Sequence, residues 1–324
     1  ILAISSVPTW RRREKLNIDY LGFFISVIFI SGFVLGFMEA PNWGWTSLPI
    51  MGLFLLSIIS LITFIGWEKK IPHPLVELTL FKNLTFTTLF SVLLIIQAVA
   101  IVFVFLAIFL QNVLHYSPLM AGLLLLPAMV PIMLMAPVGG HLRDKYGPTL
   151  PMFCGALLVV LSLIWIAIFS HNRGYAWLFP GLLVYGIGMP LILSGIMATV
   201  MNMVNAQQRG MASAIFNCAR QFGNTIGLAL LTGLLASVNK WQLNSFLHHS
   251  PVPLSRLKEQ QIDGLLVQSD QAMKAIAHLS LAHIELLKTA ALNAYTNAFS
   301  MTLLAAAILA FLSLFLILKI PRKQ

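Results

Sequence analysis

The sequence contains very little charge. Only 9% of its 324 residues are charged, whereas 59% are hydrophobic and the mean hydropathy is +0.89. Because soluble domains carry about 25% charged residues, this composition excludes an ordinary soluble domain. Several apolar runs exceed the ~20 residues that a helix needs to cross a bilayer. They are long and unbroken, unlike the short alternating strands of a membrane barrel. We therefore predict an all-α polytopic membrane protein.

Acidic side chains are absent from the interiors of these apolar runs. The ten that exist lie in connecting segments or at the ends of runs: Glu14, Asp19, Glu39, Glu68, Glu77, Asp144, Glu259, Asp263, Asp270 and Glu285. Membrane-embedded transferases usually need clustered acids, histidines or a metal. The pair His141-x-x-Asp144 comes closest to such a cluster, and the turn that contains it explains its composition. No catalytic residue, metal site or cofactor is predicted.

Cysteine is almost absent too. The two cysteines, Cys154 and Cys218, fall inside apolar runs and imply no disulfide framework. The first residues, ILAISSVPTWRRREK, lack an initiator Met, a charged leader region and a cleavage site, so they do not form a signal peptide. They are typical of the last turns of a membrane helix, which predicts that the chain is the C-terminal fragment of a larger protein.

Eight membrane spans can be located. They cover about residues 20–38, 46–67, 86–110, 118–141, 149–170, 176–201, 211–238 and 294–318. Lys and Arg gather in alternate connections and at both ends, so those connections are predicted to be cytoplasmic, as is the C-terminus. This placement accounts for the net charge of +10 and argues against a nucleic-acid partner. The expected location is a bacterial inner membrane.

A long segment, residues 239–293, separates the last two spans on the opposite side. Between 262 and 287 its apolar residues recur at near-helical spacing, which predicts an amphipathic helix on the outer membrane surface. A structural cover is favoured over a partner-binding element. The histidines of this segment are not spaced or flanked as metal ligands would be.

A short charged stretch, GGHLRDKYGP at residues 139–148, separates the fourth and fifth spans. We expect a tight cytoplasmic turn in which Gly140 and Gly147 permit sharp bending and close backbone approach. Pro148 suits the first position of the next helix. Asp144 is then expected near that helix's N-terminus, where a negative charge is favourable. A generic charged turn is the alternative interpretation.

A polar stripe runs along the seventh span. At ~100° per residue, Asn217, Arg220 and Asn224 share a narrow sector, with Gln221 at its edge. Arg220 is eleven residues past Arg209, about 16 Å along a helix and thus near mid-bilayer. Polar groups are costly against lipid, so the stripe must line a cavity or brace the protein interior. Gln97 in the third span is a further polar candidate for either role. About a quarter turn from the stripe, three small residues predict close helix contact: Ala219, Gly223 and Gly227.

Two of these stretches resemble the major facilitator superfamily. Gly140-x-x-x-Asp144-Lys145-x-Gly147 is similar to its cytoplasmic loop signature, although Pro148 and Thr149 stand where basic residues normally follow. Residues 209–227, RGMASAIFNCARQFGNTIG, resemble the penultimate helix of its fourteen-helix drug:proton antiporter branch. The resemblance implies a C-terminal six-helix bundle preceded by two linker helices, with the N-terminal six-helix half absent. The expected organisation is a helix end and basic loop at 1–18, linker helices at 19–67, a cytoplasmic loop at 68–85 and the transport half at 86–320.

The resemblance also implies a function. A proton-driven exporter of small amphipathic or drug-like compounds would work by alternating access in the lipid bilayer, with Asp144, Lys145 and their glycines as a gating loop. Since no carboxylate or histidine is central to a span, the coupling carboxylates are expected in the missing N-terminal half. Alternatives are an exporter of one metabolite or siderophore with the same fold, an integral-membrane lipid or glycan transferase, and a non-transporting scaffold. The scaffold has no need of a mid-membrane arginine.

Overall fold

The computed structural model describes residues 19–71, 74–249 and 281–320 of the chain. Throughout these ranges, every regular element is a helix. Eight helical segments there are long and apolar enough to cross a membrane. The prediction of an all-α polytopic protein with eight spans is therefore confirmed.

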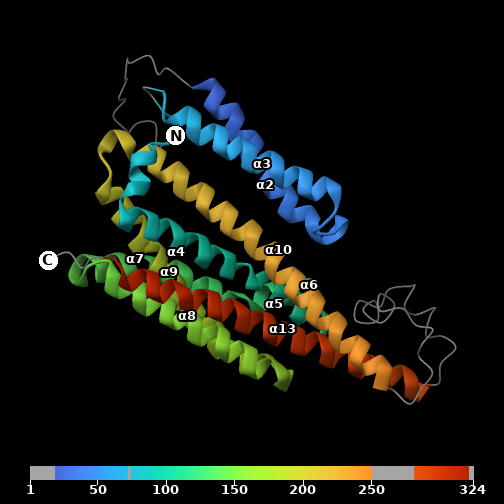
Figure 1. Ribbon diagram of the computed structural model, residues 1–324. Coiled ribbons are helices and arrows are strands. Elements are labelled where there is room, and N and C mark those ends of the chain that lie inside the picture. Colours follow the sequence, from blue (N-terminus) through green and yellow to red (C-terminus); the bar gives the residue numbers. More distant parts are fainter. Residues whose placement is uncertain (1–18, 72–73, 250–280, 321–324) are drawn as a thin grey trace, which may run out of the picture.

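The first two spans form a separate pair. They are α2 (Tyr20–Trp43) and α3 (Leu48–Glu68), which pack along each other after a short turn at Gly44. Gly44 adopts a φ of 89°, which glycine reaches without a steric penalty. Figure 1 shows the pair lying beside α10, the helix that α2 also contacts.

The other six spans form a bundle. Their helices are α4 (Leu84–Ala100), α5 (Val102–Asn112), α6 (Pro118–Leu124), α7 (Leu126–Tyr146), α8 (Thr149–Phe169), α9 (Tyr175–Met203), α10 (Arg209–His249) and α13 (Leu281–Leu318). Short 3₁₀ helices join them: η1 (Leu78–Lys82), η2 (Ser170–Asn172) and η3 (Ala206–Gln208). Helix α9 packs against α7 and α8, α13 against α8, α10 and α4, and α10 against α4. Among the six spans of the bundle, the span formed by α6 and α7 and the span formed by α10 bury the smallest share of their most apolar stretch.

The bundle core depends on close backbone contact between α8 and α9. A Cβ on Gly155 would lie 2.6 Å from the carbonyl oxygen of Gly188, and one on Gly188 would lie 2.7 Å from that of Gly155. Neither distance is possible for a real side chain, so only glycine fits at both positions. The side chains of Ile192 and Val159 pack against these glycines and are fully buried. This packing fixes α9 relative to the outer helix α8.

Two spans are interrupted. The third divides at Ile101 into α4 and α5, and the fourth divides at Leu125 into α6 and α7. Leu125 lies two residues before Pro127, which has no backbone N–H to continue the preceding helix. The other prolines within spans, Pro131 and Pro137 in α7 and Pro180 and Pro190 in α9, are held inside continuous helices.

The last two spans extend further than the sequence predicts. Residues 239–249 continue α10, and residues 281–293 belong to α13, so both ends of the predicted outer loop are helical. Leu243 and Leu287 are fully buried where the two helices pack, which explains why this less apolar sequence stays helical. Most of the amphipathic helix predicted at 262–287 lies outside the described residues.

Candidate functional site

The small-residue face of α10 contacts α4. Ala219 is fully buried, and a Cβ on Gly227 would lie 2.5 Å from Cα of Ala98. A Cβ on Gly223 would lie 2.9 Å from Cβ of Gln97. The backbones of α10 and α4 therefore approach as closely as glycine permits, and this contact fixes the rotation of α10 about its axis.

The polar stripe lies on an adjacent face of α10 and does not share this contact. Asn217, Arg220 and Gln221 are exposed and Asn224 is half-buried. Among the described residues, none is a hydrogen-bond or ion-pair partner of Arg220. The structure thus brings the four predicted stripe residues to one surface of the bundle and leaves the guanidinium available to a group outside these residues.

Gln97 lies apart from the stripe. Its side chain is 7% exposed, on the surface of α4 that faces Gly223 of α10. Of the two roles considered for Gln97, lining a cavity or bracing the protein interior, this contact between α4 and α10 agrees with bracing.

The charged stretch 139–148 is mostly helical, which corrects the predicted tight turn. Helix α7 continues to Tyr146, and the turn consists of Gly147 and Pro148 alone. Gly147 has a φ of 78°, and its N–H donates to the Arg143 carbonyl at 2.8 Å. Gly147 is therefore the residue at which α7 ends. Pro148 follows it and directly precedes Thr149, the first residue of α8. The predicted placement of Pro148 inside α8 is off by one residue.

Asp144 consequently lies in the last turn of α7 and not at the N-terminus of α8. A negative charge is unfavourable at a helix C-terminus. Arg143 compensates, since its Nε donates to Asp144 Oδ1 at 2.9 Å in addition to a contact from Nη2. Lys145 lies over the ring of Tyr146, 5.1 Å from its centroid. Asp144 remains 66% exposed, so its second oxygen is accessible.

Close backbone approach in α7 occurs at Gly139 and not at Gly140. A Cβ on Gly139 would lie 2.5 Å from Oγ of Ser194 in α9, whereas a Cβ on Gly140 would have no neighbour within 4 Å. Adjacent residues of a helix face about 100° apart, so only one of two neighbouring glycines can face α9. The sequence offered no basis for choosing between them.

A polar cluster that the sequence did not reveal joins η2 and the residue after it to the extended parts of α10 and α13. Asn297 of α13 donates to Gln242 of α10 at 2.9 Å, and its Oδ1 lies 2.9 Å from Nε2 of His171. Arg173, directly after η2, donates to Asn293 of α13. These partners are 55 to 126 residues apart, beyond the reach of any local sequence pattern.

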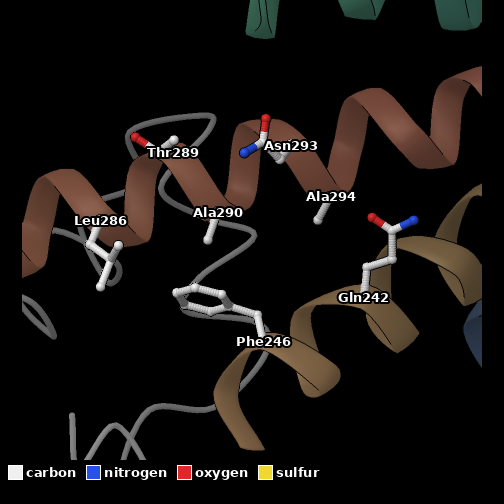
Figure 2. Close-up of a pocket in the computed structure, with 7 residues that line it drawn as sticks. All are labelled: Gln242, Phe246, Leu286, Thr289, Ala290, Asn293 and Ala294. Atoms are coloured by element: carbon white, nitrogen blue, oxygen red, sulfur yellow. The ribbon is translucent and has the colours of Figure 1, made fainter. Parts of the chain in front are cut away.

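A small pocket opens beside this cluster between α10 and α13. Its volume is about 230 Å³, and Figure 2 shows the Phe246 ring of α10 pointing toward Ala290 of α13. Gln242 and Asn293 contribute to its wall, but both already have side-chain partners. The first pocket residue of α10, Gln242, follows Asn224 of the polar stripe by 18 residues, about 27 Å along the helix, so the pocket is far from the stripe. It belongs to the packing of the extended helix pair.

Several known proteins are similar to this chain in sequence or fold. The family model described as Major Facilitator Superfamily matches residues 1–228. Multidrug resistance protein Stp of Mycobacterium tuberculosis is 30% identical over 240 residues, which are 74% of this chain and 44% of that protein. The tetracenomycin C resistance and export protein of Streptomyces glaucescens is 27% identical over 217 residues, 65% of this chain and 40% of that protein.

Two further similarities extend over nearly the whole chain. Multidrug transporter protein MdtP of Bacillus subtilis is 24% identical over 318 residues, 93% of this chain and 59% of that protein. The crystal structure of a bacterial homologue of the human lysosomal transporter Spinster, inward-facing and occupied, aligns with a TM-score of 0.53 at 14% identity. That alignment covers 91% of this chain and 66% of the other. The chain thus spans about half the length of the curated relatives it matches.

Proposed function

Because the chain belongs to the Major Facilitator Superfamily, we propose that it forms the C-terminal part of a secondary active exporter of small amphipathic compounds. The family is one of transporters, which separates the chain from the membrane transferases. The names of its relatives support export of drug-like molecules, since they include multidrug resistance and antibiotic export proteins. Inward proton flow would drive the cycle, and two helical halves would alternate access to a central site.

The polar stripe of α10 carries this proposal. An arginine near mid-bilayer is costly against lipid, by about 3 kcal/mol or more. Arg220 is exposed on a bundle that otherwise presents mostly apolar surface, and no described residue neutralises it. Its face is therefore best accounted for as a surface covered by protein or water when the transporter is complete. A non-transporting scaffold would have no use for such a residue.

The charge of Arg220 defines what can bind there. A guanidinium has five donors and no acceptor, so it recruits carboxylates, carbonyls or amides. Asn217, Gln221 and Asn224 add amide donors and acceptors along the same face. We propose that this face lines or braces the central cavity, with its partner supplied by the other half of the transporter or by an anionic group of the substrate.

Gating is assigned to the turn between α7 and α8. Asp144 is exposed in the last turn of α7, and Arg143 contacts only one of its two carboxylate oxygens. In one state this carboxylate would bind a neighbouring helix end of the other half, and in the other state it would release it. Gly147 would permit the turn to pivot, because its φ of 78° is open to glycine with little strain.

Proton coupling is assigned to residues outside this chain. In the described part, no Asp, Glu or His lies in the central portion of a bundle span. We therefore place the coupling carboxylates in an N-terminal half, and we expect this chain alone not to transport. The orientation that follows has the C-terminus in the cytoplasm of a bacterial inner membrane.

Transport by the complete protein in vesicles tests the proposal. We expect accumulation of a fluorescent amphipathic substrate that requires a proton gradient. Arg220→Ala should reduce the rate about tenfold or more, since a charge-assisted hydrogen bond is worth about 1.5–3 kcal/mol and 1.36 kcal/mol corresponds to a factor of ten. Lys288→Ala, an exposed cation on the outer part of α13, is the matched control and should transport normally.

The possible outcomes separate the parts of the proposal. Full transport by Arg220→Ala at normal expression would remove Arg220 from the mechanism. Equal transport after the gradient has been collapsed would remove proton drive. Gradient-independent turnover of a lipid substrate would favour a transferase instead.

A further inference from the structure

Two carboxyl groups meet at the end of the linker-helix pair that carries the basic connections. Glu68 is the last residue of α3, and Asp19 precedes the first residue of α2. A Cβ on Gly22 would lie 3.0 Å from Cγ of Asp19 and 3.2 Å from Oε1 of Glu68. The two side chains therefore face each other across a position where only glycine leaves room.

The two carboxyl groups are in very different surroundings. Asp19 caps α2: its Oδ1 accepts from the Gly22 N–H at 3.0 Å, and its two oxygens lie 3.2 and 3.1 Å from the indole Nε1 of Trp67. Glu68 is only 4% exposed. Its Oε2 accepts one long hydrogen bond from the Val76 N–H at 3.4 Å, and its Oε1 is buried with no partner among the described residues.

The charged groups around Glu68 do not neutralise it. Lys69 and Lys70 follow it directly, but both are exposed. Glu77, on the adjoining loop, is engaged with Gln208 and Thr79. In the part of the chain that the structure describes, neither Glu68 nor Asp19 forms an ion pair, so the charge that faces Glu68 most closely is another carboxylate.

Two ionised carboxylates in this arrangement would be strongly unfavourable. Removing a charge from water costs several kcal/mol unless a partner compensates it, and a like charge nearby adds to that cost. A single proton removes both penalties, because a protonated Oε1 becomes a donor that can bond to Asp19. The proton belongs on Glu68, since Asp19 is at a helix N-terminus with two donors, whereas Glu68 is at a helix C-terminus where negative charge is disfavoured.

We propose that Glu68 and Asp19 form a proton-binding site at which Glu68 holds the proton and donates it in a hydrogen bond to Asp19. The site joins three segments: the start of α2, the end of α3 and the loop at Val76 that leads through η1 into α4. Loss of the proton places two negative charges side by side, and their repulsion pushes the start of α2 away from the end of α3. The packing of the two linker helices at this end thereby depends on pH. This inference does not rest on export by the bundle.

Infrared difference spectroscopy of the full chain in lipid nanodiscs tests the site directly. A protonated carboxyl gives a carbonyl stretch that an ionised one lacks. We expect this band at neutral pH, where an ordinary Glu with a pKa of about 4.3 would be ionised. Glu68→Gln should abolish it. Glu39→Gln, at the opposite end of α2, is the matched control and should leave it unchanged.

A second substitution and a second readout guard against misfolding of one variant. Asp19→Asn removes the like charge, so the band should disappear at a lower pH than in the wild type. Deuterium uptake by a peptide covering the first turns of α2, residues 20–26, corrected for intrinsic exchange, should rise at alkaline pH in the wild type and stay low in Glu68→Gln. Absence of the band at neutral pH, its survival in Glu68→Gln, or uptake that rises equally in both proteins would overturn the proposal.

Discussion

At the scale of single residues, the contact between α10 and α4 makes one glycine irreplaceable. Gly227 lies against the backbone of Ala98, where a Cβ would come within 2.5 Å of Cα. We predict that Gly227→Ala lowers the free energy of unfolding by about 1–3 kcal/mol, as expected for overpacking. Thermal unfolding of the protein in detergent would measure this loss.

A matched variant on the same helix distinguishes the effect of overpacking on stability from the effect of helix propensity. Gly233 has no neighbour within 4 Å of its missing Cβ. Gly233→Ala should therefore be neutral or should stabilise the protein by up to ~1 kcal/mol, because alanine is the better helix former. Equal destabilisation by both substitutions would show that α10 does not pack on α4 through Gly227.

Sequence patterns at this scale predicted which residues share a face but not which of them meet. The period of a helix was enough to group Asn217, Arg220 and Asn224 and to separate them from Gly223. Nothing local could show that Gln97 lies beneath Gly223, or that Glu68 and Asp19 face each other. Those contacts join residues tens of positions apart, and they depend on how helices are rotated against one another.

At the scale of elements, a cross-helix amide network fastens the outer ends of α10 and α13. Asn297 contacts both Gln242 and His171. We predict that Asn297→Ala lowers the free energy of unfolding by about 1–2 kcal/mol, because each lost hydrogen bond contributes about 1 kcal/mol. Asn244→Ala removes an amide of α10 for which no described residue is a partner, and it should have little effect. Comparable melting curves for the two variants would contradict this role for Asn297.

Hydrophobicity located all eight helices but misjudged where several of them end. The predicted end of each span was the point where the apolar sequence stops. For α10 this point is near residue 238, although the helix extends to His249. The helix continues because α13 supplies a partner for its less apolar continuation, a tertiary effect that composition does not contain. The end of α7 was misjudged for the opposite reason. Charged residues in GGHLRDKY were taken as a turn, although nothing before Gly147 stops a helix.

At the scale of the whole molecule, the alternation of basic and non-basic connections predicts a fixed orientation. We expect a cysteine introduced as Lys145→Cys to react with an impermeant maleimide only from the cytoplasmic side. Asn172→Cys should react only from the outer side. Intact cells and inverted vesicles provide the two measurements, in a background where Cys154 and Cys218 are replaced by serine. Labelling of both positions from the same side would contradict the eight-span arrangement.

Helix α10 also acts as a long rigid rod. It runs without interruption from Arg209 to His249, about 60 Å at 1.5 Å per residue, and it contains no proline. The polar stripe lies in the half of α10 nearer Arg209, and the far end of the helix projects beyond the shorter helices in Figure 1. A tilt of about 10° around the stripe would displace that far end by several ångströms. A fluorophore attached at the tip would thus report small movements at Arg220 as larger displacements.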